Sequence, residues 1–237
     1  MTKRRVFDVF EWLGRHEFMV PMAVLVVVAG TWGFIALADV VLEGRTQSFD
    51  ESVLRALRLP DNPAKPIGPA WMAEVGRDVT ALGGVTVLVL ATLAVAGFLL
   101  LDRKYAAMGF VLAAVASGMV LSSLLKACFA RPRPEVVPHL SLVYTSSFPS
   151  GHSMMSAIVY LTLGTLLARM VVRRPLKVYF LAVALILTGL VGCSRVYMGV
   201  HYSTDVLAGW AAGLVWATLC WLVARRLQRR GMIEKHL

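Results

Sequence analysis

Three short segments of the sequence hold polar residues that could do chemistry together. They combine cations, imidazoles, hydroxyls, a glycine and one carboxylate: Lys126, Arg133, Ser150, Gly151, His152, Ser194, Arg195, His201 and Asp205. Arginine offers a planar fork of donors that matches phosphate oxygens, and lysine adds a compact charge. A serine and a glycine at a helix start add free backbone N–H groups and the positive helix end. These residue types predict a site that binds a phosphoryl group.

The two histidines of this set predict the reaction. Asp205 follows His201 by one helical turn if a helix begins near Ser203 or Thr204. Its carboxylate could then accept the Nδ1–H of His201, which leaves Nε2 free as a nucleophile. His152 lies on a different segment and could protonate the leaving oxygen as a general acid.

Metal catalysis is the competing mechanism. Two-metal phosphatases need several carboxylates, but the outward loops after the second predicted span offer only Glu135 and Asp205. His139, His152 and His201 show no zinc spacing. We therefore expect neither a metal nor another cofactor.

Composition shows which elements must position these residues. Apolar residues make up 58% of the 237 residues, charged residues only 16%, and the mean hydropathy is +0.70. These values exclude a soluble globule, a disordered chain and a nucleic-acid-binding domain. Apolar stretches long enough to cross a bilayer lie at about 18–42, 79–101, 105–125, 153–172, 177–193 and 204–224. We predict an all-α polytopic membrane protein with six transmembrane helices.

The basic residues predict the orientation of these spans. Most of the 24 Lys and Arg residues lie in the N-terminal segment, in the turns after the second and fourth spans, and in the tail. Both termini should therefore be cytoplasmic, and the loops after spans one, three and five should face outward. The net charge of +10 then meets anionic membrane lipids rather than nucleic acid. This layout suits a bacterial inner membrane with the active site facing the periplasm.

The longest outward loop, residues 43–78, begins with an amphipathic pattern. Phe49, Val53, Leu54 and Leu57 recur at helical spacing, and four prolines follow. The predicted short helix could be a packing cap or a lid over a lipid site. The three cysteines, Cys128, Cys193 and Cys220, are too few for a disulfide framework, and we interpret them as buried small hydrophobes.

The ordered pattern of the polar residues resembles a known family. Lys126-x6-Arg133-Pro134, then Pro149-Ser150-Gly151-His152, then Ser194-Arg195-x5-His201-x3-Asp205 is similar to the signature of the type-2 phosphatidic acid phosphatase (PAP2) superfamily. The signature spans residues 126–205 of what we interpret as a single domain, residues 1–237. The six-span layout resembles the bacterial integral-membrane branch.

This resemblance implies a role for each residue. The histidine matching His201 attacks phosphorus and forms a phosphohistidine, the aspartate matching Asp205 supports it, and the histidine matching His152 protonates the leaving group. The phosphoryl oxygens are held by the residues matching Lys126, Arg133, Ser150, Gly151, Ser194 and Arg195. Members of the family generally work without a metal. Arg131 lies outside the signature, and we expect it to face solvent.

A phosphate site at a membrane edge suits a lipid phosphate or diphosphate. The resemblance implies a lipid phosphatase, and we place undecaprenyl (polyprenyl) diphosphate first among its substrates. Phosphatidylglycerophosphate, phosphatidate and lipid A are the alternatives within the family. A lipid phosphotransferase that shares the phosphohistidine, and an anion transporter, are alternatives of other classes. The sequence does not indicate an oligomeric state.

Overall fold

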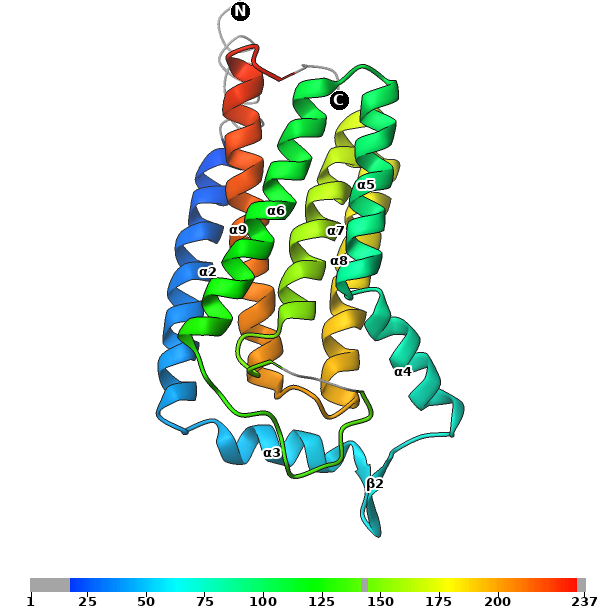
Figure 1. Ribbon diagram of the computed structural model, residues 1–237. Coiled ribbons are helices and arrows are strands. Elements are labelled where there is room, and N and C mark those ends of the chain that lie inside the picture. The colour runs from blue at the N-terminus through cyan, green and yellow to red at the C-terminus, as the bar shows by residue number, and fades with distance from the viewer. Residues whose placement is uncertain (1–17, 142–144, 234–237) are drawn as a thin grey trace, which may run out of the picture.

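The computed structural model describes residues 18–141 and 145–233, and these form a bundle of long helices with smaller elements at one end (Figure 1). The basic N-terminal residues and Lys235, which contribute to the predicted orientation, lie outside the described residues. The elements are α2 Met19–Leu42, α3 Gln47–Ala56, β1 Arg58–Leu59, β2 Asn62–Pro66, α4 Trp71–Ala81, α5 Val85–Leu101, α6 Tyr105–Cys128, α7 Gly151–Met170, α8 Arg174–Tyr197 and α9 Ser203–Arg229. The strands β1 and β2 form a two-stranded antiparallel hairpin.

Five of these helices are long and apolar enough to cross a membrane: α2, α6, α7, α8 and α9. Helices α4 and α5 pass the same test together but meet at a 48° bend, so a sixth span exists only if this bent pair is counted as one. The prediction of an all-α polytopic protein is confirmed. The predicted continuous span 79–101 is wrong, however, because the chain breaks at Gly83 and Gly84, and Gly84 adopts an extended conformation. A Cβ atom at Gly83 would clash with Val191 Cγ1 and would lie 3.3 Å from His152 Cβ, so glycine allows this turn to pack closely against α7 and α8.

Several predicted spans are longer in the structure. The fifth, predicted at 177–193, is the 24-residue helix α8, and it continues through Arg195 to Tyr197. The sixth, α9, begins at Ser203, as the placement of Asp205 required, and ends at Arg229. Hydropathy marks only the apolar part of a helix, so charged turns at helix ends are missed.

Helix α7 lies at the centre of the bundle and packs against α5, α6, α8 and α9. Its contact with α9 depends on two glycines of α9. A Cβ atom at Gly209 would lie 2.6 Å from the Ser150 carbonyl oxygen, and one at Gly213 would lie 2.6 Å from that of Met154. Small residues allow membrane helices to approach this closely. The N-terminal ends of α7 and α9 are thereby held side by side.

The sides of the helices that point away from the centre of the bundle are strongly apolar. Leu25, Val28 and Trp32 of α2 and Leu185 and Ile186 of α8 are all more than half exposed. Apolar surface of this extent on long helices is typical of contact with lipid. The interpretation of the cysteines as buried is correct for Cys220 and wrong for Cys128 and Cys193, which lie on the exposed surface.

The loop 43–78 folds over one end of the bundle, beside the first turns of α7 and α9 (Figure 1). The predicted amphipathic helix is confirmed as α3, and it packs against α9. Its Leu54 is fully buried against Val137, Val196, Tyr202 and Val206. The predicted site residues all belong to this end of the molecule.

The orientation predicted from the basic residues places the end of the bundle that carries α3 and the site residues on the outer side of the membrane. In a variant whose cysteines are replaced by serine, a cysteine placed at the exposed Asn62 in the β1–β2 hairpin should react with a membrane-impermeant maleimide added to intact cells. A reporter fused after residue 237 should report the cytoplasm. Labelling at position 62 only after the membrane is permeabilised would contradict the orientation.

Candidate active site

A cavity of about 400 Å³ opens between the ends of α4, α5, α6, α7 and α8. Its lining includes Lys126, Arg133, Gly151, His152, Arg195 and His201. These residues come from three segments that are far apart in the sequence, and six of the nine predicted site residues therefore meet at one place. The volume fits a small polar headgroup with part of an apolar chain.

The three cations of the cavity have neutral partners. Lys126 Nζ donates to Thr145 Oγ1 at 3.2 Å and to the Ser146 carbonyl at 3.0 Å. Arg133 donates to the carbonyls of Thr145 and Val200 at 2.7 and 2.6 Å. Hydroxyls and carbonyls solvate a cation without cancelling its charge.

Arg195 completes the set of cations. Only 2% of this residue is exposed, its Nη1 donates to Thr80 Oγ1 at 3.1 Å, and its buried Nε has no hydrogen-bond partner among the described residues. No aspartate or glutamate of the described chain lines the cavity. The cavity therefore carries an excess of positive charge that suits an anion.

His201 lies in the loop between α8 and α9 and is almost completely buried. Its Nε2 lies 3.2 Å from Nη1 of Arg133. A guanidinium can only donate, so Nε2 must accept and the proton must be on Nδ1. This is the tautomer that a nucleophilic Nε2 requires.

Asp205 holds the other side of the imidazole. Its Oδ2 lies 3.4 Å from His201 Nδ1, accepts the Tyr202 backbone N–H at 2.9 Å, and also accepts the hydroxyl of Ser147. Ser147 Oγ lies 3.4 Å from the same Nδ1. Asp205 occupies the first turn of α9, where the helix dipole favours a negative charge.

Burial and neighbouring charge keep His201 neutral. Removal from water, with the charges of Arg195 and Arg133 and against the opposing effect of Asp205, lowers the pKa of His201 to about 4. Burial likewise lowers the pKa of Arg133. A neutral imidazole at physiological pH has the lone pair that attack on phosphorus needs.

The start of α7 supplies backbone donors and His152. Ser150 caps the helix, because its hydroxyl accepts from the Ser153 backbone N–H at 3.4 Å, and it is fully buried. A Cβ atom on Gly151 would lie 2.9 Å from Lys126 Cε, so glycine is needed for the lysine to cross the helix end. Because its hydroxyl caps α7, Ser150 supports the helix end, and it does not line the cavity.

Two predictions about single residues need correction. Ser194 was expected to hold phosphate, but its hydroxyl donates to the Val191 carbonyl at 2.7 Å and the residue lines an apolar cavity on another face of α8. Arg131 was expected to face solvent, but its side chain is only 8% exposed and pairs with Asp50 and Asp205. Four further residues contact the site but belong to no motif, so no sequence pattern predicted them: Thr80, Thr145, Ser147 and Asp50.

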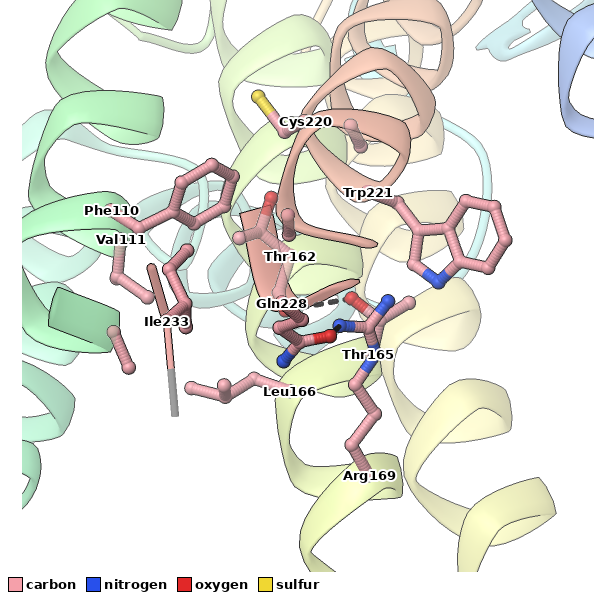
Figure 2. A pocket seen from close by; sticks show the side chains of 13 residues that line it. Phe110, Val111, Thr162, Thr165, Leu166, Arg169, Cys220, Trp221, Gln228 and Ile233 are labelled. Atoms are coloured by element: carbon pink, nitrogen blue, oxygen red, sulfur yellow. Dashed lines mark hydrogen bonds between the residues drawn. The ribbon is translucent and has the colours of Figure 1, made fainter. Parts of the chain in front are cut away.

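The described residues contain no group of three or more His, Cys, Asp or Glu side chains that could hold a metal ion. A second cavity lies at the opposite end of α7, where Arg169 donates to Gln228 at 2.9 Å beside Trp221 (Figure 2). It measures only about 40 Å³, and its lining contains no histidine or carboxylate. The cavity around His201 is therefore the better candidate for chemistry.

Comparison with known proteins identifies the family. The PAP2 superfamily model matches residues 86–229. Phosphatidylglycerophosphatase B of Bacillus subtilis (strain 168) is 33% identical over 187 residues, which cover 77% of this chain and 86% of that protein. Lipid A 1-phosphatase of Rhizobium johnstonii is 34% identical over 130 residues, which cover 51% of this chain and 48% of that protein.

Solved structures show the same fold. The crystal structure of a transmembrane PAP2 type phosphatidylglycerolphosphate phosphatase from Bacillus subtilis matches with a TM-score of 0.75 and 30% identity, covering 86% of this chain and 98% of that chain. The crystal structure of Aquifex aeolicus LpxE matches with a TM-score of 0.53 and 25% identity, covering 73% and 92% of the two chains.

The chain belongs to the PAP2 superfamily, as the three-part motif indicated. It is a multi-pass membrane lipid phosphatase. The anion-transporter alternative receives no support from these relatives, which are all phosphatases by name or by family.

The environment of His201 predicts its titration. Because the pKa is lowered to about 4, the folded chain stays neutral at this position while an unfolded chain takes up the proton near pH 6.5. The free energy of unfolding should therefore fall as the pH drops from about 6.5 to about 4. In isotope-labelled histidine spectra, the signal that His201→Asn removes should titrate near pH 4. Titration of that signal near pH 6.5 would contradict the described environment.

Proposed function

We propose that His201 is the nucleophile of a phosphohistidine mechanism at the cavity described above. The observation that carries the proposal is the 3.2 Å contact between His201 Nε2 and Arg133, inside a cavity with three cations and no described carboxylate. A phosphoryl group bound by these cations would place its phosphorus next to Nε2. Orientation and electrostatic stabilisation are what phosphoryl transfer chiefly needs from a protein.

The proposed reaction has two chemical steps, formation and hydrolysis of a phosphohistidine. Nε2 of His201 attacks phosphorus, the P–O bond to the lipid breaks, and His152 gives its proton to the leaving oxygen. Asp205 accepts a hydrogen bond from Nδ1–H and stabilises the charged ring that forms. Water then attacks the phosphohistidine, His152 takes its proton, and the N–P bond breaks. Inorganic phosphate is released and both histidines return to their first state.

Arg133, Lys126 and Arg195 bind the phosphoryl oxygens in this proposal. In the described structure Arg133 occupies Nε2, so binding must transfer the guanidinium from that nitrogen to a phosphoryl oxygen. The exchange exposes the lone pair only when an anion is present. The backbone N–H groups at Gly151 and His152 add the positive end of α7.

The apolar part of the cavity indicates where the lipid lies. Val85, Met119 and Met155 line it from α5, α6 and α7, whose other residues reach into the bilayer. The headgroup would meet the cations while the acyl chains remain among these helices. A polyprenyl diphosphate is the substrate expected first from the sequence, but a relative that matches 77% of this chain is a phosphatidylglycerophosphatase. We therefore propose a glycerophospholipid monophosphate as substrate, with the polyprenyl diphosphate as the alternative.

Histidine variants test the mechanism. His201→Ala should abolish turnover, because no nucleophile remains, and His152→Ala should slow the chemical step by about 10²–10⁴-fold. His139→Ala is the matched control, since its Nε2 contacts the Pro134 carbonyl at 2.6 Å and lines no described part of the cavity. Phosphate release by purified protein in detergent is the measurement, and normal turnover by His201→Ala would refute the nucleophile assignment.

A substrate panel tests the lipid. Phosphatidylglycerophosphate, phosphatidate, lipid A and a polyprenyl diphosphate are compared by kcat/KM for release of inorganic phosphate, with and without excess EDTA. We expect the glycerophospholipid monophosphates to give the highest values and EDTA to leave them unchanged. Phosphorylated lipid in place of free phosphate would indicate a phosphotransferase. A strict metal requirement would contradict the mechanism.

A further inference from the structure

A buried ion-pair network outside the three-part motif contacts the carboxylate of Asp205. Arg131 Nη1 lies 2.6 Å from Asp205 Oδ1, and Arg131 Nη2 lies 2.9 Å from Asp50 Oδ2. Both carboxylates have no exposed surface, and the arginine side chain is 8% exposed. Because one guanidinium serves both carboxylates, the position of Asp205 is tied to helix α3.

Asp50 also holds the first turn of α9 directly. Its Oδ1 accepts the Thr204 backbone N–H at 3.1 Å, and its Oδ2 accepts the Thr204 hydroxyl at 2.6 Å. On the other side, the Arg131 guanidinium lies 4.1 Å from the centre of the Tyr202 ring. The network therefore fixes Thr204, which precedes Asp205, and Tyr202, which follows His201.

The other end of the His201 loop is held from the same part of the chain. Arg58 follows α3 in β1, is 3% exposed, and donates through Nη1 to the Tyr197 carbonyl at 3.0 Å. Tyr197 is the last residue of α8. The segment from α3 to β1 thus brackets the loop that carries His201.

We propose that Asp50 and Arg131 are positioning residues that act on the reaction through Asp205. The proposal rests on the function proposed above. Neither residue lines the cavity, so neither contacts the substrate. With Oδ1 of Asp205 occupied by Arg131, Oδ2 remains directed at His201 Nδ1 and fixes the plane of the ring. Loss of Arg131, or of the Asp50 carboxylate that holds it, weakens the contact at Oδ1. The carboxylate is then held through Oδ2 alone, by the Tyr202 N–H and Ser147, and the orientation of the His201 ring is less well fixed.

Steady-state kinetics provide the first test. Asp50→Asn keeps the shape of the side chain and removes its charge, and Arg131→Lys keeps a charge that cannot reach both carboxylates. We expect kcat to fall by about 10–100-fold, as when outer partners that orient reacting histidines are removed. KM and the inhibition constant of inorganic phosphate should stay unchanged, because the three cavity cations are untouched. Unchanged kcat in both variants would overturn the proposal.

Arg55→Gln is the matched control. It removes a charge from the exposed face of α3, where Arg55 pairs with Glu51 at 3.1 Å and makes no described contact with Asp50 or Arg131. It should leave kcat at the level of the unsubstituted protein. A loss equal to that of Asp50→Asn would indicate a general effect on α3 and would count against positioning.

A second measurement separates positioning from folding. If Arg131 acts through Asp205, then Arg131→Lys should cause no further loss of kcat in an Asp205→Asn background. Equal losses in both backgrounds would overturn the proposal, and so would failure of both Asp50→Asn and Arg131→Lys to elute as folded protein. An unsubstituted protein that releases no phosphate from any lipid of the panel would instead refute the proposed function itself.

Discussion

The site depends on three cations that lie at one cavity without carboxylate partners. Arg195 is buried and Lys126 and Arg133 are partly buried, and all three contact hydroxyls or carbonyls, which solvate their charges but do not neutralise them. Burying a charge without neutralising it is costly, and a phosphoryl group supplies the missing negative charge. Burial lowers the pKa of His201 most, and the charges of Arg195 and Arg133 add to this effect. The cations that suit an anion therefore also help to keep the proposed nucleophile neutral.

Helix packing sets the relative positions of the two histidines. His152 lies in the first turn of α7 and Asp205 in the first turn of α9, and these helices touch through Gly209, where a side chain would meet the Ser150 carbonyl. A backbone hydrogen bond of 2.9 Å from Ser150 N to the Asp205 carbonyl fixes the same junction. The spacing between the proposed general acid and the proposed nucleophile therefore depends on a close helix–helix contact. This explains how residues from separate loops form a site with little freedom.

Features encoded locally could be predicted from the sequence, and features that depend on helix rotation or distant pairing could not. Apolar length gave the spans, and the Ser150–His152 pattern gave a helix start. The predicted grouping of Ser194 with Arg195 in one site does not occur, because α8 continues to Tyr197. The two residues are therefore rotated by about 100° relative to each other within a helix, and they face different cavities. The pairing of Arg131 with Asp50 joins segments that no spacing rule connects. Among these isolated charges, only the fold reveals which ones meet.

The network also bears on the two interpretations of the loop 43–78, a packing cap or a lid. A lid must separate from the site during turnover. Movement of α3 would break the contacts of Asp50 with Arg131 and Thr204, and separating buried charges from their partners is costly. Leu54 would also leave its contacts with Val206 and Tyr202. The lining of the cavity, by contrast, includes Val85 of α5 and Met119 of α6 and no residue of α3. Binding at this cavity therefore does not require α3 to move, and the contacts of Asp50 and Leu54 favour the packing cap.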